Sequence, residues 1–139
     1  WSPDGKWIMY TVADYGTFPI WHSECQLEMM NLHTGEIVNM DLVNSDRSDT
    51  YHSWASDSRW FVFASKRGDG KYGRPYFSHV DENGLVTKPF VLPQEDPWLY
   101  EDCLRSFNIP DLSNGPVNFD AESIGQMVRE VEAARFAVK

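Results

Sequence analysis

The chain has 139 residues, of which 42% are hydrophobic and 14% aromatic, so it contains enough apolar material for a folded core and falls outside the disordered class. Its 12 lysines and arginines against 21 aspartates and glutamates give a formal net charge of −9, which argues against nucleic acid as a partner. The sequence also lacks an apolar run of the roughly 18 residues that a membrane-spanning helix needs, so no transmembrane segment is expected.

The chain opens on the heptapeptide WSPDGKW (1–7), which returns in altered form as WASDSRW (54–60). Both copies have tryptophan at each end, aspartate at the fourth place (Asp4 and Asp57) and a cation at the sixth. Each is rich in turn-forming residues and is followed by an apolar stretch with high β propensity. A turn and strand that recur after about 50 residues predict a repeat of small β-sheet units, as in a β-propeller.

The predicted strands follow in chain order. The first unit contributes strands near 6–12, 25–31 and 36–41, and the second contributes strands at 50–54, 59–65, 74–80 and 85–91. The innermost strand of the first unit is expected to precede Trp1. We therefore interpret the chain as the C-terminal piece of a longer protein whose remaining blades lie upstream.

WSPDGKWIMYT resembles the core motif of the TolB-like β-propeller repeat, in which a Ser-Pro-Asp-Gly-Lys turn joins the innermost strand of a blade to the second strand. WASDSRWFVFASKRGDG is similar to the same motif with its Ser-x-Arg-x-x-Gly exit, carried by Ser65, Arg67 and Gly70. This copy departs from the pattern at Ser56 and Ser58, which stand in place of proline and glycine. The resemblance implies an all-β fold with two consecutive four-stranded antiparallel blades, the first of them incomplete.

Four regions follow from this assignment: an incomplete blade at 1–49, a complete blade at 50–92, an irregular segment at 93–119 packed on the propeller, and a C-terminal α-helix at 120–139. The irregular segment is rich in turn-forming residues, and we expect its apolar side chains to hold it against the sheets: Trp98, Leu99, Tyr100, Leu104 and Phe107. The helix is predicted to begin at the N-cap Asp120 and to have one apolar face, made by Ile124, Met127, Val128, Val131 and Ala134.

No pattern in the sequence predicts a catalytic or metal centre. The histidines stand apart from one another, and Cys25 and Cys103 have neither a CxxC nor a zinc-ligand spacing. The Gly-x-Ser-x-Gly motif of α/β-hydrolases is absent as well. We expect no metal and no cofactor, interpret Asp4 and Asp57 as structural turn residues, and leave open whether the two cysteines are thiols or a disulfide.

The tryptophans of the two heptapeptides are expected to pack between neighbouring sheets, where large rings fill the space: Trp1, Trp7, Trp54 and Trp60. A binding site is predicted on the innermost strand of the second blade and on the turns at its ends, because the innermost strands of a propeller line its channel. The candidate residues are Asp49, Tyr51, His52, Trp54, Arg67 and Asp69.

The resemblance also implies a function. TolB-like proteins are periplasmic propellers that dock peptides or envelope proteins on one face, so we expect a noncatalytic binding scaffold in the periplasm or another extracytoplasmic compartment, with a protein or peptide as its partner. The alternative is the accessory propeller of a serine peptidase of the prolyl-oligopeptidase class, whose catalytic domain would lie outside this sequence. A structural role in cytochrome assembly is a third possibility, although no CxxCH motif supports it.

Overall fold

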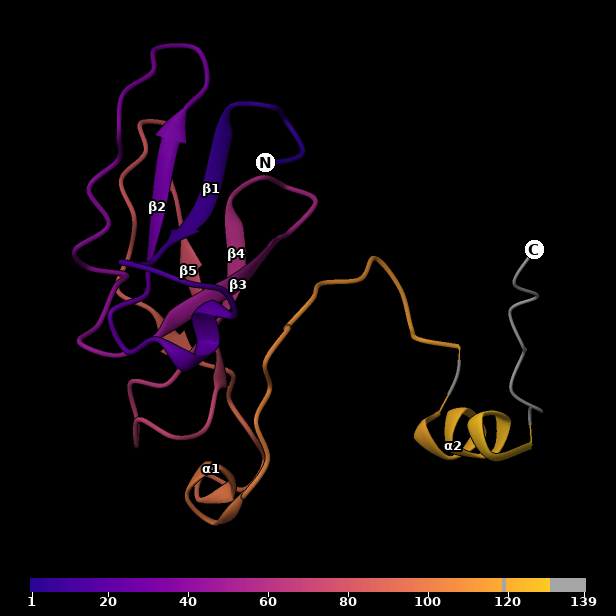
Figure 1. Ribbon diagram of the computed structural model, residues 1–139. Helices are drawn as coiled ribbons and strands as arrows, with labels where there is room; N and C mark the ends of the chain where they lie inside the picture. The colour runs from indigo at the N-terminus through magenta and orange to yellow at the C-terminus, as the bar shows by residue number, and fades with distance from the viewer. Residues whose placement is uncertain (119, 131–139) are drawn as a thin grey trace, which may run out of the picture.

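The computed structural model describes residues 1–118 and 120–130. In these residues the strands form two antiparallel sheets and helices are few, which confirms the expected all-β class (Figure 1). Sheet A pairs β1 (Trp7–Val12) with β2 (Gln26–Asn31). Sheet B has the order β3-β4-β5-β6, with β3 (Asp49–Trp54), β4 (Trp60–Ser65), β5 (Arg74–His79) and β6 (Phe90–Val91). The helical elements are the 3-10 turn η1 (Pro19–Trp21), α1 (Leu99–Asp102) and α2 (Ala121–Glu130).

The same hydrogen-bonded turn precedes β1 in sheet A and β4 in sheet B. The N–H of Ser2 donates to the carbonyl of Trp7 at 2.8 Å, and Ala55 donates to Trp60 at 2.8 Å. In each turn an aspartate carboxylate accepts a backbone amide: Oδ1 of Asp4 accepts from Lys6 N at 3.1 Å, and Oδ1 of Asp57 accepts from Arg59 N at 2.9 Å. Gly5 and Ser58, at the same place in the two turns, both adopt left-handed backbone conformations, with φ of 73° and 60°.

Two of the predicted strands are shorter than expected or missing. At 36–41 the chain forms only an isolated bridge between Ile37 and Met30, because a turn at Met40, whose carbonyl accepts from Val43 N at 2.9 Å, leads it away from the sheet. The strand predicted at 85–91 is reduced to the two residues of β6 and an isolated bridge between Val80 and Val86. It is interrupted at Pro89, which has no N–H to donate to a β ladder.

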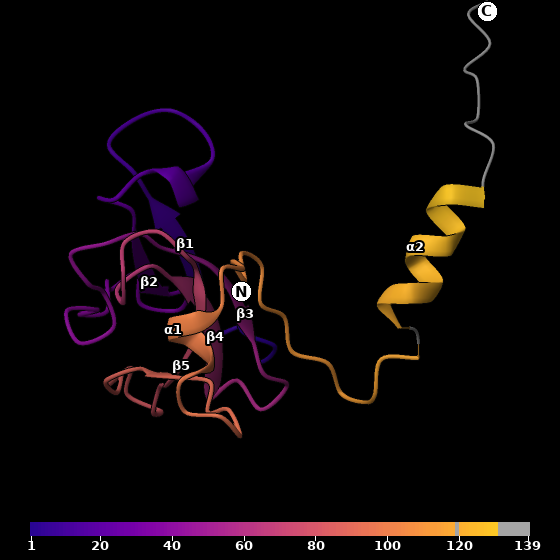
Figure 2. The same ribbon diagram turned by 90° about the horizontal axis from the view of Figure 1, so that it is seen from below.

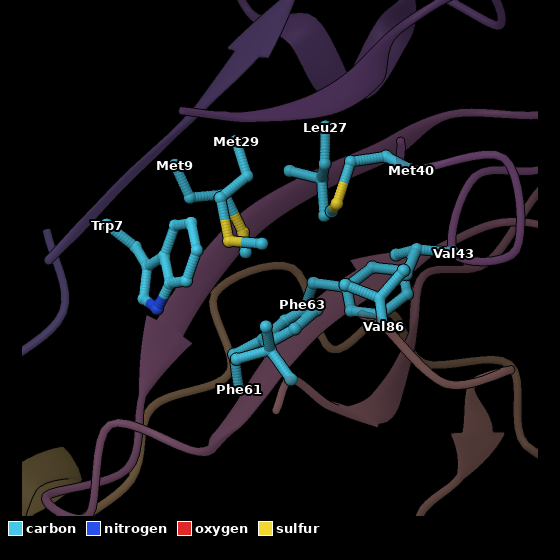
Figure 3. Packing of buried hydrophobic residues seen from close by; sticks show 10 residues of the cluster. Trp7, Met9, Leu27, Met29, Met40, Val43, Phe61, Phe63 and Val86 are labelled. Atoms are coloured by element: carbon cyan, nitrogen blue, oxygen red, sulfur yellow. The ribbon is translucent and has the colours of Figure 1, made fainter. Parts of the chain in front are cut away.

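The core lies between the two sheets. Figure 3 shows Trp7, Met9 and Met29 of sheet A directed toward Phe61 and Phe63 of sheet B. Each of these side chains is at most 4% exposed, and burial of a side chain of this size stabilises the fold by about 1.5–3 kcal/mol. The contact follows from strand alternation, because every second residue of β1 and of β4 faces the opposite sheet.

The heptapeptide tryptophans do not all pack as expected. Trp7 is buried between the sheets at 2% exposure, and Trp54 packs at the margin of the same core. Trp60, which occupies the place of Trp7 in the second unit, is 38% exposed, and Trp1 is 80% exposed. The expectation of inter-sheet packing is therefore wrong for Trp1 and Trp60. The described residues form two sheets with one interface between them, and these two rings lie outside that interface.

After β6 the chain forms α1 and then runs without regular secondary structure to α2, which lies apart from the sheets in both views (Figures 1 and 2). Asp120 caps α2 by accepting from Ser123 N at 2.7 Å, and the apolar residues Ile124, Met127 and Val128 are exposed. Val131 and Ala134 lie outside the described residues. No helix of the described residues is long and apolar enough to span a bilayer.

Candidate functional site

Two of the predicted binding residues, Asp49 and Arg67, come together inside the protein. Asp49 begins β3 and is completely buried, and its Oδ1 lies 2.8 Å from Nη2 of Arg67, in the turn that follows β4. The other carboxylate oxygen of Asp49 accepts from both the N–H and the hydroxyl of Ser45, at 2.6 and 2.8 Å. Both oxygens of this carboxylate are therefore occupied by the protein itself.

The guanidinium of Arg67 has further partners through Nε and Nη2. It donates to the carbonyl of Val43 at 2.6 Å and to the hydroxyl of Ser65 at 2.7 Å, and it lies over the ring of Tyr76, 4.6 Å from its centroid. The Asp49–Arg67 pair thus joins β3, the turn after β4 and the loop that connects the two sheets. A buried ion pair needs such additional hydrogen bonds to offset the cost of removing both charges from water.

The middle of β3 is irregular. The pairing with β4 shifts in register between Thr50 and Ser53, and Tyr51 in this bulge has a φ of 48°. Bulges reorient side chains and are frequent beside binding sites. The neighbouring His52 is half-buried, and burial lowers the pKa of its imidazole to about 4.

The remaining two predicted residues lie elsewhere. Trp54 packs on Phe61 with ring centroids 5.4 Å apart. Asp69 closes a turn between β4 and β5, where its Oδ1 accepts from Lys71 N at 2.8 Å and from Tyr72 N at 2.9 Å. Burial acts to raise the pKa of Asp69, but these amide donors outweigh it and the pKa is lowered. The structure therefore joins Asp49 to Arg67 but does not gather all six residues around one cavity.

A different arginine, Arg74 at the start of β5, organises the region after β6. It is 5% exposed and donates from Nη2 to the carbonyls of Tyr100 at 2.7 Å and Cys103 at 2.8 Å, and from Nη1 to that of Arg105. Its guanidinium also lies 5.4 Å from the ring centroid of Tyr100. Beside it is a cavity of about 450 Å³ that Asp69, Tyr76, Val91 and Glu101 help to line.

The expectation that apolar side chains hold this segment against the sheets is wrong for Trp98 and Leu104. Trp98 is 63% exposed and Leu104 is 76% exposed. The segment is held by a charged side chain that binds backbone carbonyls, a contact for which the segment's own sequence carries no signal. Cys103, whose carbonyl accepts from Arg74, and the buried Cys25 are both free thiols.

Beyond Arg105 the chain crosses the outer face of sheet B, the face opposite the core. We call residues 105–112 the strap. Its Phe107 N–H donates to Gly73 O at 2.9 Å, and the hydroxyl of Ser53 donates to the carboxylate of Asp111. A cavity of about 270 Å³ remains between strap and sheet, lined by Val62, Pro75, Phe77, Leu92 and the strap residues 107–112.

Among the described residues no group of His, Cys, Asp or Glu side chains is placed to hold a metal ion. Comparison of the chain with protein-family models, with curated proteins and with solved structures finds no match.

Proposed function

We propose that this chain is a noncatalytic binding scaffold of the cell envelope, built from propeller-type β-sheet units of the TolB-like kind. The observation that carries the proposal is the repeated turn. Asp4 and Asp57 accept equivalent amide hydrogen bonds in the turns that lead into β1 and β4, and sheets A and B pack face to face. Units of this kind bury one face against the next unit and leave loops and a sheet face for partners.

The polar residues of the predicted site support a structural role. The carboxylate of Asp49 and the guanidinium of Arg67 are hydrogen-bonded to each other and to the surrounding chain. A hydrolase needs a nucleophile and a base within reach of each other and open to a substrate. Asp57 likewise has a twin in Asp4, and both carboxylates serve the local turn.

The proposal is tested by two measurements on the purified chain. The first is a screen against esterase, peptidase and phosphatase substrates, in which we expect no turnover above that of a mock preparation. Turnover that survives further purification and disappears on substitution of a single serine or histidine would overturn the proposal.

The second measurement is a selection of peptides displayed on phage, with the immobilised chain as bait. A binding scaffold should enrich related sequences that bind in solution with a measurable and saturable Kd. A selection that enriches no such sequence, with the chain shown to be folded by circular dichroism, would contradict a binding function.

A further inference from the structure

We propose that the outer face of sheet B is a groove for an extended, proline-containing apolar segment of a partner protein, and that the strap is an internal ligand which this segment displaces. The inference rests on the proposed binding function and adds to it a surface and a class of partner. It is carried by the strap itself, which shows what kind of chain the groove accepts.

The repeat identifies this face as a packing surface. Val62 holds the place in β4 that Met9 holds in β1, since each comes two residues after the second tryptophan of its heptapeptide. Met9 is buried at 4% exposure because sheet B covers its face of sheet A. Val62 is buried at 1% exposure, and the cavity it lines is closed by the strap. Within the described residues the strap therefore takes the role that a further sheet would play.

The strap is bound by its backbone at one end and by a side chain at the other. Phe107 N–H donates to Gly73 O at 2.9 Å, and Gly73 N–H donates to the hydroxyl of Ser106 at 3.2 Å. A Cβ atom at Gly73 would lie 3.4 Å from Oδ1 of Asn108 and 3.5 Å from the carbonyl oxygen of Phe107, so the strap passes directly over this residue. At the far end the carboxylate of Asp111 accepts from the hydroxyl of Ser53.

The strap fills the groove incompletely. Phe107 is 39% exposed and Ile109 is 75% exposed, and the cavity of about 270 Å³ beneath them is unfilled by side chains. The apolar surface also continues beyond the strap to Trp60, which is 38% exposed, and Phe90, which is 47% exposed. A partner segment with larger apolar side chains would bury more surface here than the strap does.

The strap competes with any partner segment for the groove, and it does so while attached beside it. The three carbonyl bonds to Arg74 hold the chain up to Arg105, so the strap is tethered beside the groove. A short tether gives an effective concentration of the order of millimolar, so a partner at lower concentration must bind the groove more tightly than the strap does. Release of the strap should therefore raise the apparent affinity of a free peptide.

The test is fluorescence anisotropy with a labelled peptide of sequence SFNIPDL, which copies residues 106–112. In the full chain, the double variant Phe107→Ala/Asp111→Ala removes the Phe107 ring that lines the groove and the Asp111 carboxylate that binds Ser53, whereas the backbone bond of residue 107 to Gly73 and the Arg74 bonds remain. We expect this variant to bind the peptide at least about tenfold more tightly than the unaltered chain does. The matched control is Val128→Ala, an exposed residue of α2, which should bind as the unaltered chain does.

The groove itself is tested by adding Ser53→Ala to the Phe107→Ala/Asp111→Ala chain, which we call the released variant. The added substitution should weaken binding of the peptide, because the peptide's aspartate carboxylate loses the hydroxyl that donates to it. A peptide with alanine in place of its phenylalanine and aspartate should bind at least about tenfold more weakly than SFNIPDL. Circular dichroism shows whether each variant is folded.

Equal affinity of the released variant and the unaltered chain, or no saturable binding to a folded released variant, would overturn the inference. A released variant that dimerises without binding the peptide would also overturn it, since the occupant would then be a second copy. In a further outcome, peptides from the phage selection bind the unaltered chain and the Ser53→Ala variant with equal affinity. That result would support the binding function but would place the binding site outside the groove, which would overturn the inference.

Discussion

The hydroxyl of Ser58 accepts a hydrogen bond from the backbone N–H of Asp4 at 3.0 Å, across 54 positions of the sequence. This contact joins the two repeated turns directly. It also accounts for one departure of the second heptapeptide from the repeat pattern. Ser58 stands where the first copy has Gly5, and it keeps a left-handed backbone with a φ of 60°. The strain of that conformation in a serine is offset by a hydrogen bond that glycine lacks.

Substitution of Ser58 separates these two effects. Ser58→Ala keeps the left-handed strain and loses the hydrogen bond, so the free energy of unfolding should fall by about 1 kcal/mol. Ser58→Gly loses the same bond but relieves strain of about 1 kcal/mol, and should leave stability close to that of the unaltered chain. Urea denaturation followed by circular dichroism measures both. Equal losses for the two variants would contradict this account of Ser58.

The buried pair of Asp49 and Arg67 should be sensitive to loss of the carboxylate charge. Asp49→Asn leaves the guanidinium of Arg67 without its counter-charge in a buried place, and the free energy of unfolding should fall by about 3 kcal/mol or more. Asp46→Asn is a matched control, because Asp46 is exposed in the same loop and should change stability by less than about 0.5 kcal/mol. A loss for Asp49→Asn no larger than for the control would show that the pair is not structural.

Substitution of Thr50 should increase stability rather than reduce it. Its side chain is completely buried in β3, and its hydroxyl has no hydrogen-bond partner. Thr50→Val replaces that hydroxyl by a methyl group of similar size and removes a buried polar atom that is unsatisfied. The free energy of unfolding should rise by about 1 kcal/mol. A thermal melt gives the sign of the change, and a lower Tm for Thr50→Val would mean that the hydroxyl is satisfied in solution.

His52 should make stability depend on pH. Its imidazole has a pKa of about 4 in the folded chain, lowered mainly by burial, whereas an unfolded histidine has a pKa of about 6.5. Between these values the unfolded chain binds a proton that the folded chain does not, so stability is full above about pH 6.5 and falls as the pH approaches 4. Between pH 7 and pH 5 the free energy of unfolding should fall by about 2 kcal/mol.

His52→Gln should remove this dependence, while His33→Gln, at an exposed position, should keep it. Urea denaturation at pH values between about 7 and 5, above the range in which most carboxylates titrate, measures the slope. The same slope in all three proteins would assign the pH dependence to other groups.

The short-range features of this protein could be predicted from its sequence. The aspartates of the heptapeptides bond amides two residues along the chain, and the strands that follow are marked by a run of apolar and β-branched residues. These interactions depend on a few consecutive residues, so the turns at 1–7 and 54–60, the strands after them and the all-β class were all expected.

Contacts between distant segments were decided only by the tertiary structure. Trp7 and Trp60 have the same local sequence context, yet one is buried and the other exposed, because burial depends on whether another sheet lies against the ring. Asp49 of β3 pairs with Arg67 in the turn after β4, and Arg74 binds carbonyls 26 to 31 residues further along the chain. A backbone carbonyl exists at every residue, so no residue type in 100–105 indicates which of them an arginine will bind.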